Sequence, residues 1–494
     1  MNKYLPSLFS ALLMGVAQQP WGFGFLAWFS LVPFIYCINQ QKTYTEIIKQ
    51  SFIWSFLYHL IFFFWISDNI GIDNQIVRYL IMLLVVLVLS INIIIIYILY
   101  FYFKKNFKQV NLIYILPFII VTIEYLRSLG FYGSVWNSLS YTQTDYLLLS
   151  QNIEYTGIYG LTFWIVLINV IIYKIIKELN FQNLLLFVCF FSMPFLTGYI
   201  IKSNHINNGP KIKVKLVQPN ISLNEKRESL RGSLIKLINL SSNTSNQDID
   251  LIVWPESSIS GSFLKNGYYN SKISPAMNNF LKNSQIYLVA GADLKIMNKR
   301  YNSSLLFKSD SILNIFHKQK LVPNVERTPD IFSSFGINLG LTNFNIGNEL
   351  TIFSLNENKF ATMICIESVF PDLTRKFVNN GAEFLTYIVN DGWYPRNPQL
   401  EQHARRCIYR AIENRRYVIR SANTGITMVV DSYGNITDKL EFNKEGVLET
   451  NITILNQKTF YTKYGDLFSV FNLLFMFLLT INSFFRNFGV FREN

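Results

Sequence analysis

ATMICIESVFPDLTRKFVNNG, residues 361–381, changes character at Cys365, where an apolar strand ends and a helix can begin within a few residues. A strand followed closely by a helix is typical of α/β domains, so this segment favours that fold class. The positive end of the helix would favour the thiolate form of Cys365, which makes this residue a candidate nucleophile. Glu367 is a candidate for orienting a substrate or a catalytic lysine. The competing interpretation is an inert buried cysteine, the commoner role for this residue type.

Two more candidates stand at the ends of expected strands. In DLIVWPESS, residues 250–258, Pro255 stops the strand and leaves Glu256 at its rim, where a carboxylate can act as a general base. In FHKQKLVPNVERTP, residues 316–329, Lys318 precedes Glu326, and a buried ammonium can stabilise an oxyanion. Taken alone, each is better explained as a solvated surface charge. Because open α/β sheets bind ligands at the carboxyl ends of their strands, we expect Glu256, Lys318 and Cys365 to meet.

The region between Lys202 and Asp466 has the composition of a globular domain, with Asn, Ser, charged residues and regular turns. Alternation in Lys211–Gln218 predicts a half-buried strand, and Leu400–Arg416 is rich in helix formers. Further strands are expected at six short apolar runs: Leu251–Trp254, Ile286–Ala290, Leu305–Lys308, Ala361–Ile366, Phe384–Val389 and Thr427–Val430. Strands alternating with helices predict an α/β domain of about 250 residues.

The remainder of the chain has the composition of a membrane protein. Of its 494 residues, 50% are hydrophobic and 15% are charged, against roughly 25% charged in soluble domains. Eight charge-poor stretches are expected to span a membrane, because about 30 Å of hydrocarbon takes roughly 20 apolar residues to cross. They are residues 5–18, 22–38, 50–67, 79–103, 111–126, 156–173, 183–201 and 467–485. We therefore expect a transmembrane bundle of seven helices at 1–201, an external domain at 202–465, and a last helix with a tail at 466–494.

Charge in the short loops predicts the orientation of these spans. Lysines follow the second, fourth and sixth expected spans, at Lys42, Lys104 and Lys174, whereas the loop 68–77 holds Asp68 and neither Lys nor Arg. Because basic loops stay in the cytoplasm, both termini are expected inside and residues 202–465 outside. Basic cytoplasmic loops therefore account for part of the formal net charge of +13, which argues against a nucleic-acid partner. The four cysteines show no CxxC spacing, so neither a disulfide framework nor a zinc site is indicated.

Several motifs together resemble the nitrilase, or carbon–nitrogen hydrolase, superfamily. Segments similar to those that carry its Glu-Lys-Cys triad are Trp254-Pro255-Glu256, Lys318 with Leu321-Val322-Pro323 and Glu326, and Cys365-Ile366-Glu367. Asn390-Asp391-Gly392-Trp393, the helix from His403 to Arg416 and the segment from Arg420 to Gly425 add to the match. Eight spans, with this domain between the seventh and the eighth, make the whole chain similar to the apolipoprotein N-acyltransferase family.

The resemblance implies an αββα sandwich on a membrane bundle, with the sandwich on the periplasmic side of a bacterial inner membrane. Cys365 would attack the sn-1 ester of a phospholipid, typically phosphatidylethanolamine, and form a thioester. The N-terminal amine of a diacylglyceryl-cysteine lipoprotein would then accept the acyl chain. Glu256 would act as the base and Lys318 would stabilise the oxyanion, with Glu326 and Glu367 in support. No metal or cofactor is implied.

Residues beside the triad depart from the family pattern. Asn324-Val325 stand where Phe-Gly is usual, Ile366 where an aromatic residue commonly follows the nucleophile, and Lys226-Arg227 near the place of a common Trp. The resemblance therefore predicts the chemistry but neither the head group nor the acyl chain of the donor.

Two other functions stay open at this point. One is a membrane-tethered amidase of the nitrilase type, with water as the final acceptor. The other is a membrane binding protein or transporter whose external domain has lost catalysis. The intact Glu-Lys-Cys set argues against the second, and a transporter should also show functional charges deep in its spans, where His59 and Glu124 are better explained as structural.

Overall fold

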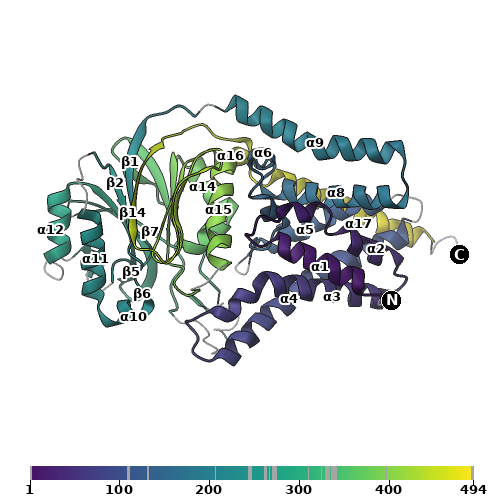
Figure 1. Ribbon diagram of the computed structural model, residues 1–494, viewed down its shortest axis with the longest axis horizontal. Coiled ribbons are helices and arrows are strands. Elements are labelled where there is room, and N and C mark those ends of the chain that lie inside the picture. The colour runs from purple at the N-terminus through teal and green to yellow at the C-terminus, as the bar shows by residue number, and fades with distance from the viewer. Residues whose placement is uncertain are drawn as a thin grey trace. The chain divides into compact units, whose positions relative to one another are not determined.

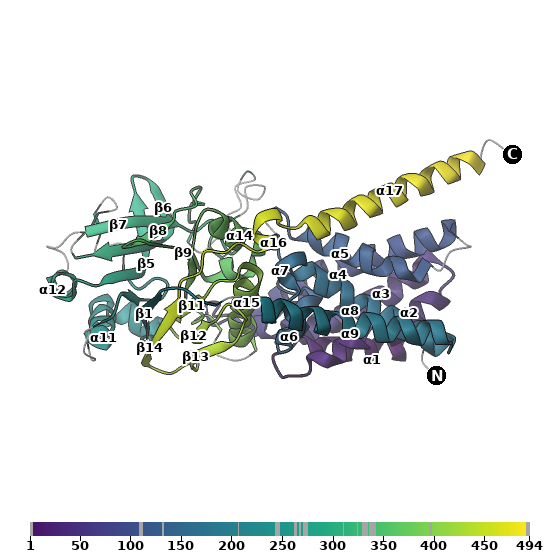
Figure 2. The ribbon, with the colours of Figure 1, turned by 90° about the horizontal axis from the view of Figure 1, so that it is seen from above.

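The computed structural model describes residues 3–107, 112–130, 133–205, 207–242, 248–260, 264–265, 268–269, 275–309, 311–323, 325–328, 334, 342–394 and 398–490. The chain forms two compact units, residues 1–205 with 464–494 and residues 206–463. The first unit is helical, and the second contains the β-sheets (Figures 1 and 2).

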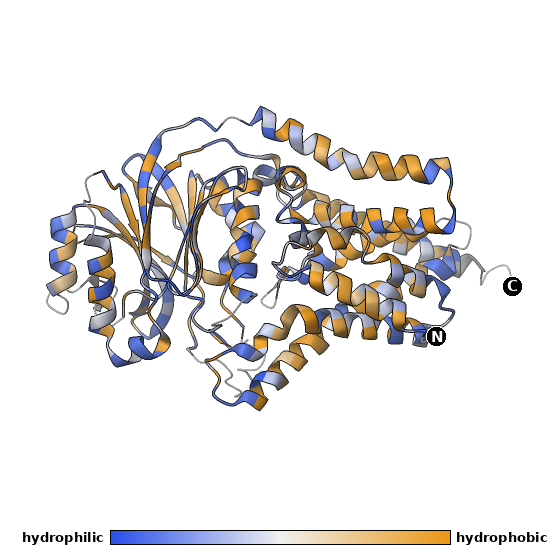
Figure 3. Ribbon diagram, in the orientation of Figure 1, coloured by the Kyte–Doolittle hydropathy of each residue, from blue (hydrophilic) through white to orange (hydrophobic). Residues whose placement is uncertain are grey.

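The helical unit is built from long apolar helices, which Figure 3 shows as largely orange ribbons. Within the described ranges, five helices are long and apolar enough to cross a membrane: α3 (Tyr44–Phe63) with the 3-10 turn Phe64–Asp68, α4 (Gln75–Asn106), α8 (Ile158–Lys177), α9 (Phe181–Asn204) and α17 (Leu467–Val490). Five of the predicted spans coincide with these helices. The unit is therefore that of a membrane protein.

The other three predicted spans form shorter helices. α1 (Leu5–Ala17), α2 (Val32–Gln40) and α5 (Leu116–Arg127) have 13, 9 and 12 residues. The expected span 22–38 is interrupted, because Gly24–Trp28 forms a 3-10 helix and α2 begins only at Val32, with Pro33 in its first turn. Two further short helices, α6 (Leu147–Ser150) and α7 (Ile153–Thr156), precede α8. The count of eight crossings therefore stays a prediction.

Two titratable side chains are buried among these helices. Glu124 accepts a hydrogen bond from the Ser138 hydroxyl at 3.0 Å. The ring of His59 lies between Ser55 Oγ and Asn137 Nδ2, both at 3.0 Å. Because buried polar groups are stable when they are hydrogen-bonded, these contacts fit the structural role expected for both residues.

The second unit is a sandwich of two six-stranded sheets. One has the strand order β14-β1-β2-β5-β6-β7 and the other β13-β12-β11-β10-β9-β8. In each sheet three neighbouring strands are parallel, and antiparallel strands continue both edges. The first sheet contains β1 (Lys211–Gln218), β2 (Leu251–Val253), β5 (Tyr287–Ile296), β6 (Lys299–Lys308), β7 (Ser311–His317) and β14 (Gly446–Thr453). The second contains β8 (Phe353–Leu355), β9 (Asn358–Ile364), β10 (Phe384–Val389), β11 (Val418–Ala422), β12 (Thr427–Val430) and β13 (Ile436–Leu440).

Helices cover the outer faces of both sheets, as Figure 1 shows. The first sheet is covered by α11 (Leu230–Ser242) and α12 (Pro275–Ser284), and the second by α14 (Pro371–Asn379) and α15 (Gln399–Asn414). Short helices α10 (Leu223–Glu228) and α16 (Phe460–Tyr464) and the antiparallel pair of β3 (Leu264–Lys265) and β4 (Tyr268–Tyr269) complete the described part of the unit. The two sheets with outer helices confirm the α/β sandwich that the sequence predicted for this region.

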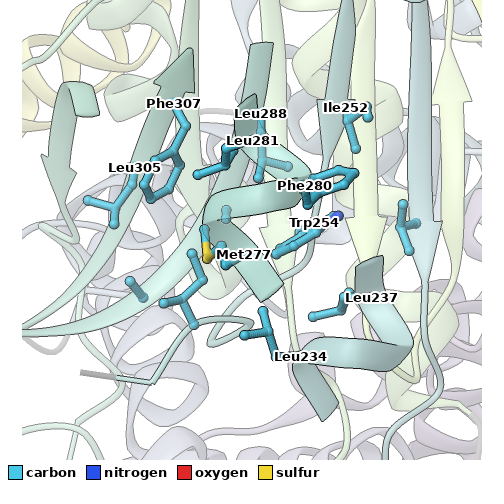
Figure 4. Close-up of a cluster of buried hydrophobic side chains, with 14 of the residues drawn as sticks. Leu234, Leu237, Ile252, Trp254, Met277, Phe280, Leu281, Leu288, Leu305 and Phe307 are labelled. Carbon is cyan, nitrogen blue, oxygen red and sulfur yellow. The ribbon is translucent and has the colours of Figure 1, made fainter. Parts of the chain in front are cut away.

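An apolar core beneath α11 and α12 fixes the end of β2 (Figure 4). Trp254 is fully buried, stacks on Phe280 with ring centroids 5.7 Å apart, and donates a hydrogen bond from Nε1 to Ser241 Oγ at 2.8 Å. Burying a large side chain of this kind stabilises the fold by about 1.5–3 kcal/mol. Since Pro255 and Glu256 follow Trp254 directly, this packing also fixes the position of the Glu256 backbone.

Candidate active site

Glu256 lies just beyond β2 and is 8% exposed, and both of its carboxylate oxygens accept hydrogen bonds. Oε1 accepts a hydrogen bond from Asn302 Nδ2 at 2.8 Å, and Oε2 accepts one from the backbone N–H of Asn390 at 2.9 Å. The neighbouring strand β5 approaches so closely that only glycine fits at Gly291, whose N–H donates to the carbonyl of Pro255 at 3.2 Å. The carboxylate is therefore held in one place by contacts from both sheets.

Lys318 follows β7 and is 1% exposed. Its Nζ lies 2.9 Å from Glu326 Oε1 and 3.4 Å from Glu256 Oε1. Burial alone would lower the pKa of this ammonium, but the charges of Glu326 and Glu256 outweigh burial and raise it. Lys318 is therefore a fixed cation between two carboxylates.

Asn302, on β6, was not anticipated from the sequence. Its Nδ2 donates to Glu326 Oε1 at 2.9 Å as well as to Glu256, so one amide bridges the two carboxylates. The other oxygen of Glu326 accepts from the N–H of Val322 at 2.7 Å. The sequence carried no signal for this residue, because Asn302 lies outside the strand expected at Leu305–Lys308 and its burial follows from the fold.

Cys365 stands at the junction of β9 and the 3-10 helix Cys365–Val369, with φ of +53°. The expectation that its thiolate is favoured is wrong for the resting protein. Burial raises the pKa of the thiol well above its ordinary value, and the negative charge of Glu256 adds to this, while Lys318 offsets only part. The thiol is therefore protonated at neutral pH and needs a base to become a nucleophile.

Glu367 connects the strand that carries Cys365 to the segment that carries Lys318. Its Oε2 accepts from the N–H of Ile364 at 2.7 Å, and its Oε1 accepts from the N–H groups of Gln319 and Lys320 at 2.7 and 3.1 Å. Burial raises the pKa of this carboxyl to about 7, against the opposing effect of these N–H donors. The side chain touches backbone on both sides and therefore positions the two segments.

Asp391, His403 and Arg420 form a buried cluster beside Cys365 that no strand-end argument had singled out. One ligand-type atom each from Cys365, Asp391 and His403 lie within 4.8 Å of one another, a spacing that a metal ion could use. However, His403 and Asp391 already bind each other at 2.8 Å, and Arg420 Nη2 donates to Asp391 at 2.7 Å. Because these side chains already bind one another, the cluster is better explained as a support for Cys365.

The departures from the family pattern fall partly within the described residues. Asn324 lies outside them. Ile366 is half-buried beside the nucleophile. Lys226 donates a hydrogen bond from Nζ to the carbonyl of Ser257 at 2.5 Å, so this lysine lies against the residue that follows Glu256.

The structure thus joins Glu256, Lys318 and Glu326 by direct contacts and places Cys365 within their electrostatic reach. A protonated thiol, a carboxylate that can take its proton and a fixed cation are the parts needed for covalent acyl transfer.

Family models match both halves of the chain. The apolipoprotein N-acyltransferase N-terminal domain matches residues 10–171, and the carbon–nitrogen hydrolase domain matches residues 213–456. The apolipoprotein N-acyltransferase of Thermotoga maritima is 30% identical over 479 residues, covering 94% of this chain and 91% of its own. The enzyme of the same name from Rickettsia bellii is 28% identical, covering 96% and 97%.

Solved structures of the nitrilase superfamily align with about half of the chain. Saccharomyces cerevisiae Nit3 has 20% identity and a TM-score of 0.38, covering 49% of this chain and 90% of its own. An amidase from Nesterenkonia sp. has 15% identity and a TM-score of 0.39, covering 53% and 96%.

Proposed function

Because this chain belongs to the apolipoprotein N-acyltransferase family, we propose that Glu256, Lys318 and Cys365 carry out its acyl transfer. As a member of this family, the protein is a membrane acyltransferase that N-acylates lipoproteins and takes the acyl chain from a lipid. The observation that supports the residue assignment best is the buried ammonium of Lys318, held 2.9 and 3.4 Å from two carboxylates beside a protonated cysteine.

In the first half-reaction, Glu256 takes the proton of the Cys365 thiol as Sγ attacks the carbonyl carbon of a phospholipid sn-1 ester. Lys318 stabilises the negative charge that develops on the carbonyl oxygen. When the tetrahedral intermediate collapses, the ester C–O bond breaks and Glu256 returns the proton to the leaving lysophospholipid alkoxide. The product is a thioester on Cys365.

In the second half-reaction, the amine of a diacylglyceryl-cysteine lipoprotein attacks the thioester carbon. Glu256 accepts the amine proton, the C–S bond breaks, and the proton returns to the Cys365 thiolate. One carboxylate serves both steps, so substituted-enzyme (ping-pong) kinetics are expected. Glu326 holds the Lys318 ammonium in place, and Glu367 holds the Cys365 and Lys318 segments in position relative to each other.

Phosphatidylethanolamine is the donor we propose. We place the enzyme in a bacterial inner membrane with eight crossings, the helices at 1–201 and 466–494 and the catalytic domain at 202–465 on the periplasmic side. Lipid substrates support a membrane location, since each CH₂ exposed to water during transfer would cost about 0.8 kcal/mol. The residues proposed for the reaction supply its acid, base and nucleophile without a cofactor.

The test is intact-protein mass spectrometry of detergent-purified enzyme incubated with phosphatidylethanolamine. We expect the mass of one acyl chain on the wild type, removed by neutral hydroxylamine and absent from Cys365→Ala. Adding a diacylglyceryl-cysteine peptide should discharge the adduct and yield N-acylated peptide. Free fatty acid in place of that peptide would favour the amidase instead. A folded wild type that gains no acyl mass from any phospholipid would refute Cys365 as the nucleophile.

A further inference from the structure

His403 links the nucleophile to a buried ion pair. Its Nε2 lies 3.1 Å from the carbonyl oxygen of Cys365 and its Nδ1 lies 2.8 Å from Asp391 Oδ1. Arg420 Nη2 donates to the other oxygen of Asp391 at 2.7 Å. The side chains of His403, Asp391 and Arg420 are 2%, 1% and 0% exposed, so water does not compete for these contacts.

The partners of His403 determine which of its nitrogens donates to Cys365. Nε2 faces the carbonyl oxygen of Cys365, which can only accept, so Nε2 carries a hydrogen. Nδ1 faces Asp391 Oδ1 and also lies 3.4 Å from Arg420 Nη2. Burial alone would raise the pKa of Asp391, but His403 and Arg420 outweigh burial and lower it, so the carboxylate stays ionised. His403 therefore donates from Nε2 to the carbonyl of the nucleophile, and the Asp391–Arg420 ion pair holds the ring in place.

The carbonyl that His403 holds belongs to a strained residue. Cys365 has φ of +53°, a conformation that costs a residue with a side chain energy and persists only where its surroundings enforce it. Because the peptide bond is planar and trans, the N–H of Ile366 points to the side opposite that carbonyl. Fixing the carbonyl toward His403 thus also fixes the direction of the next N–H.

We propose that His403 is a positioning residue for acyl transfer. By holding the Cys365 carbonyl, it turns the N–H of Ile366 toward the oxyanion that forms when Cys365 attacks, where this N–H acts together with Lys318. Asp391 and Arg420 hold the ring in this orientation. The inference rests on the proposed role of Cys365 as the nucleophile.

Two substitutions of His403 separate the contacts of its two nitrogens. The amide of Gln reaches as far as Nε2, so His403→Gln keeps a donor for the Cys365 carbonyl. The shorter His403→Asn places its amide where Nδ1 was and loses that donor. Ser368→Ala is the matched control, because it removes another donor to the same carbonyl, the Ser368 hydroxyl at 3.1 Å, and leaves His403 in place.

The experiment uses the full chain in detergent and measures three rates or properties for each variant. The first is acylation of Cys365 by phosphatidylethanolamine, followed by intact mass. The second is alkylation of Cys365 by iodoacetamide, which attacks the same sulfur but forms no oxyanion. The third is the thermal unfolding temperature.

We expect His403→Asn to acylate roughly 10- to 100-fold more slowly, between the effect of losing one buried hydrogen bond and that of losing an oxyanion donor. His403→Gln should lose less than about tenfold, and Ser368→Ala less than His403→Asn. Alkylation should stay close to the wild-type rate in all three. If His403→Asn does not fold, a folded His403→Gln that acylates more than about 100-fold slower overturns the proposal.

Two other results would also overturn it. Equal acylation by His403→Gln and His403→Asn would show that the contact with Cys365 is not what matters. Parallel losses of acylation and alkylation would show general damage to the site. In both cases a wild type that forms the acyl adduct leaves the proposed function standing, whereas a wild type without an adduct refutes that function and this inference with it.

Discussion

A methyl group at Gly291 should displace the proposed base without unfolding the domain. Added there, it would lie 2.6 Å from Glu256 Cα and from Ser257 N, and 2.8 Å from the carbonyl oxygen of Pro255. Non-bonded heavy atoms pack at about 3.5 Å, so the backbone around Glu256 must withdraw by about 3.5 − 2.6 = 0.9 Å. These neighbours are backbone or Cα atoms, so no change of rotamer relieves the clash. Since a misplacement of about 1 Å can cost roughly 100-fold in rate, we expect Gly291→Ala to form the acyl-enzyme roughly 100-fold more slowly.

The assay is the rate at which acyl mass appears on Cys365 with phosphatidylethanolamine, alongside thermal unfolding. Overpacking should destabilise the domain by about 1–3 kcal/mol, a fall of several degrees in unfolding temperature. Gly446→Ala, on β14 of the same sheet, is the control, because a methyl there would meet Leu440 at an ordinary 3.5 Å and should leave the rate unchanged. A folded Gly291→Ala that acylates at the wild-type rate would refute the reasoning, since the position of Glu256 would then not limit the reaction.

Three further predictions test other parts of the catalytic domain. Asn302→Leu removes the donor shared by Glu256 and Glu326, so acylation should slow roughly 10- to 100-fold by the same assay, and an unchanged rate would contradict the bridge. The pKa of Glu367 is raised in the fold from 4.5 to about 7, so this carboxyl adds stability below about pH 4.5 that is lost as the pH rises to about 7. The unfolding temperature of the wild type minus that of Glu367→Gln should therefore fall across this range, and a constant difference would count against a neutral buried carboxyl. Leu281→Ala, in the core of Figure 4, should cost about 2–5 kcal/mol in denaturant unfolding, whereas Ile235→Ala, at a 39% exposed position, should cost under about 0.5 kcal/mol. Similar losses for both would place Leu281 outside the core.

Regular local patterns made much of the fold predictable. The strands expected at Lys211–Gln218, Phe384–Val389 and Thr427–Val430 match β1, β10 and β12 residue for residue, because each is a short run of alternating or apolar residues. The helix expected at Leu400–Arg416 is α15, which ends two residues earlier because Arg415 takes a left-handed conformation with φ of +49°. β7, at Ser311–His317, was not predicted, since its side chains are only partly buried.

The site was predictable only where one segment carried its own signal. Glu256, Lys318 and Cys365 each stand at a strand end, which the sequence alone reveals. The contact of His403 with Asp391 joins α15 to the segment after β10, and Asn302 lies in mid-strand, so both became visible only with the packing of the sheets. The thiolate expectation for Cys365 failed because burial depends on the tertiary fold and here outweighs the local helix terminus.

The pairing of β1 with β14 also bears on how this protein is made. β1 is the first strand of the catalytic domain and β14 the last, yet Lys211 pairs with Thr453 and Gln218 with Gly446. The sheet edge therefore stays open while the intervening residues are synthesised, and such distant pairing forms slowly. A ribosome that stops before residue 446 leaves an unpaired β1 edge, a template for aggregation. Quality control by proteases should therefore act most strongly on chains in which β14 has not yet been made.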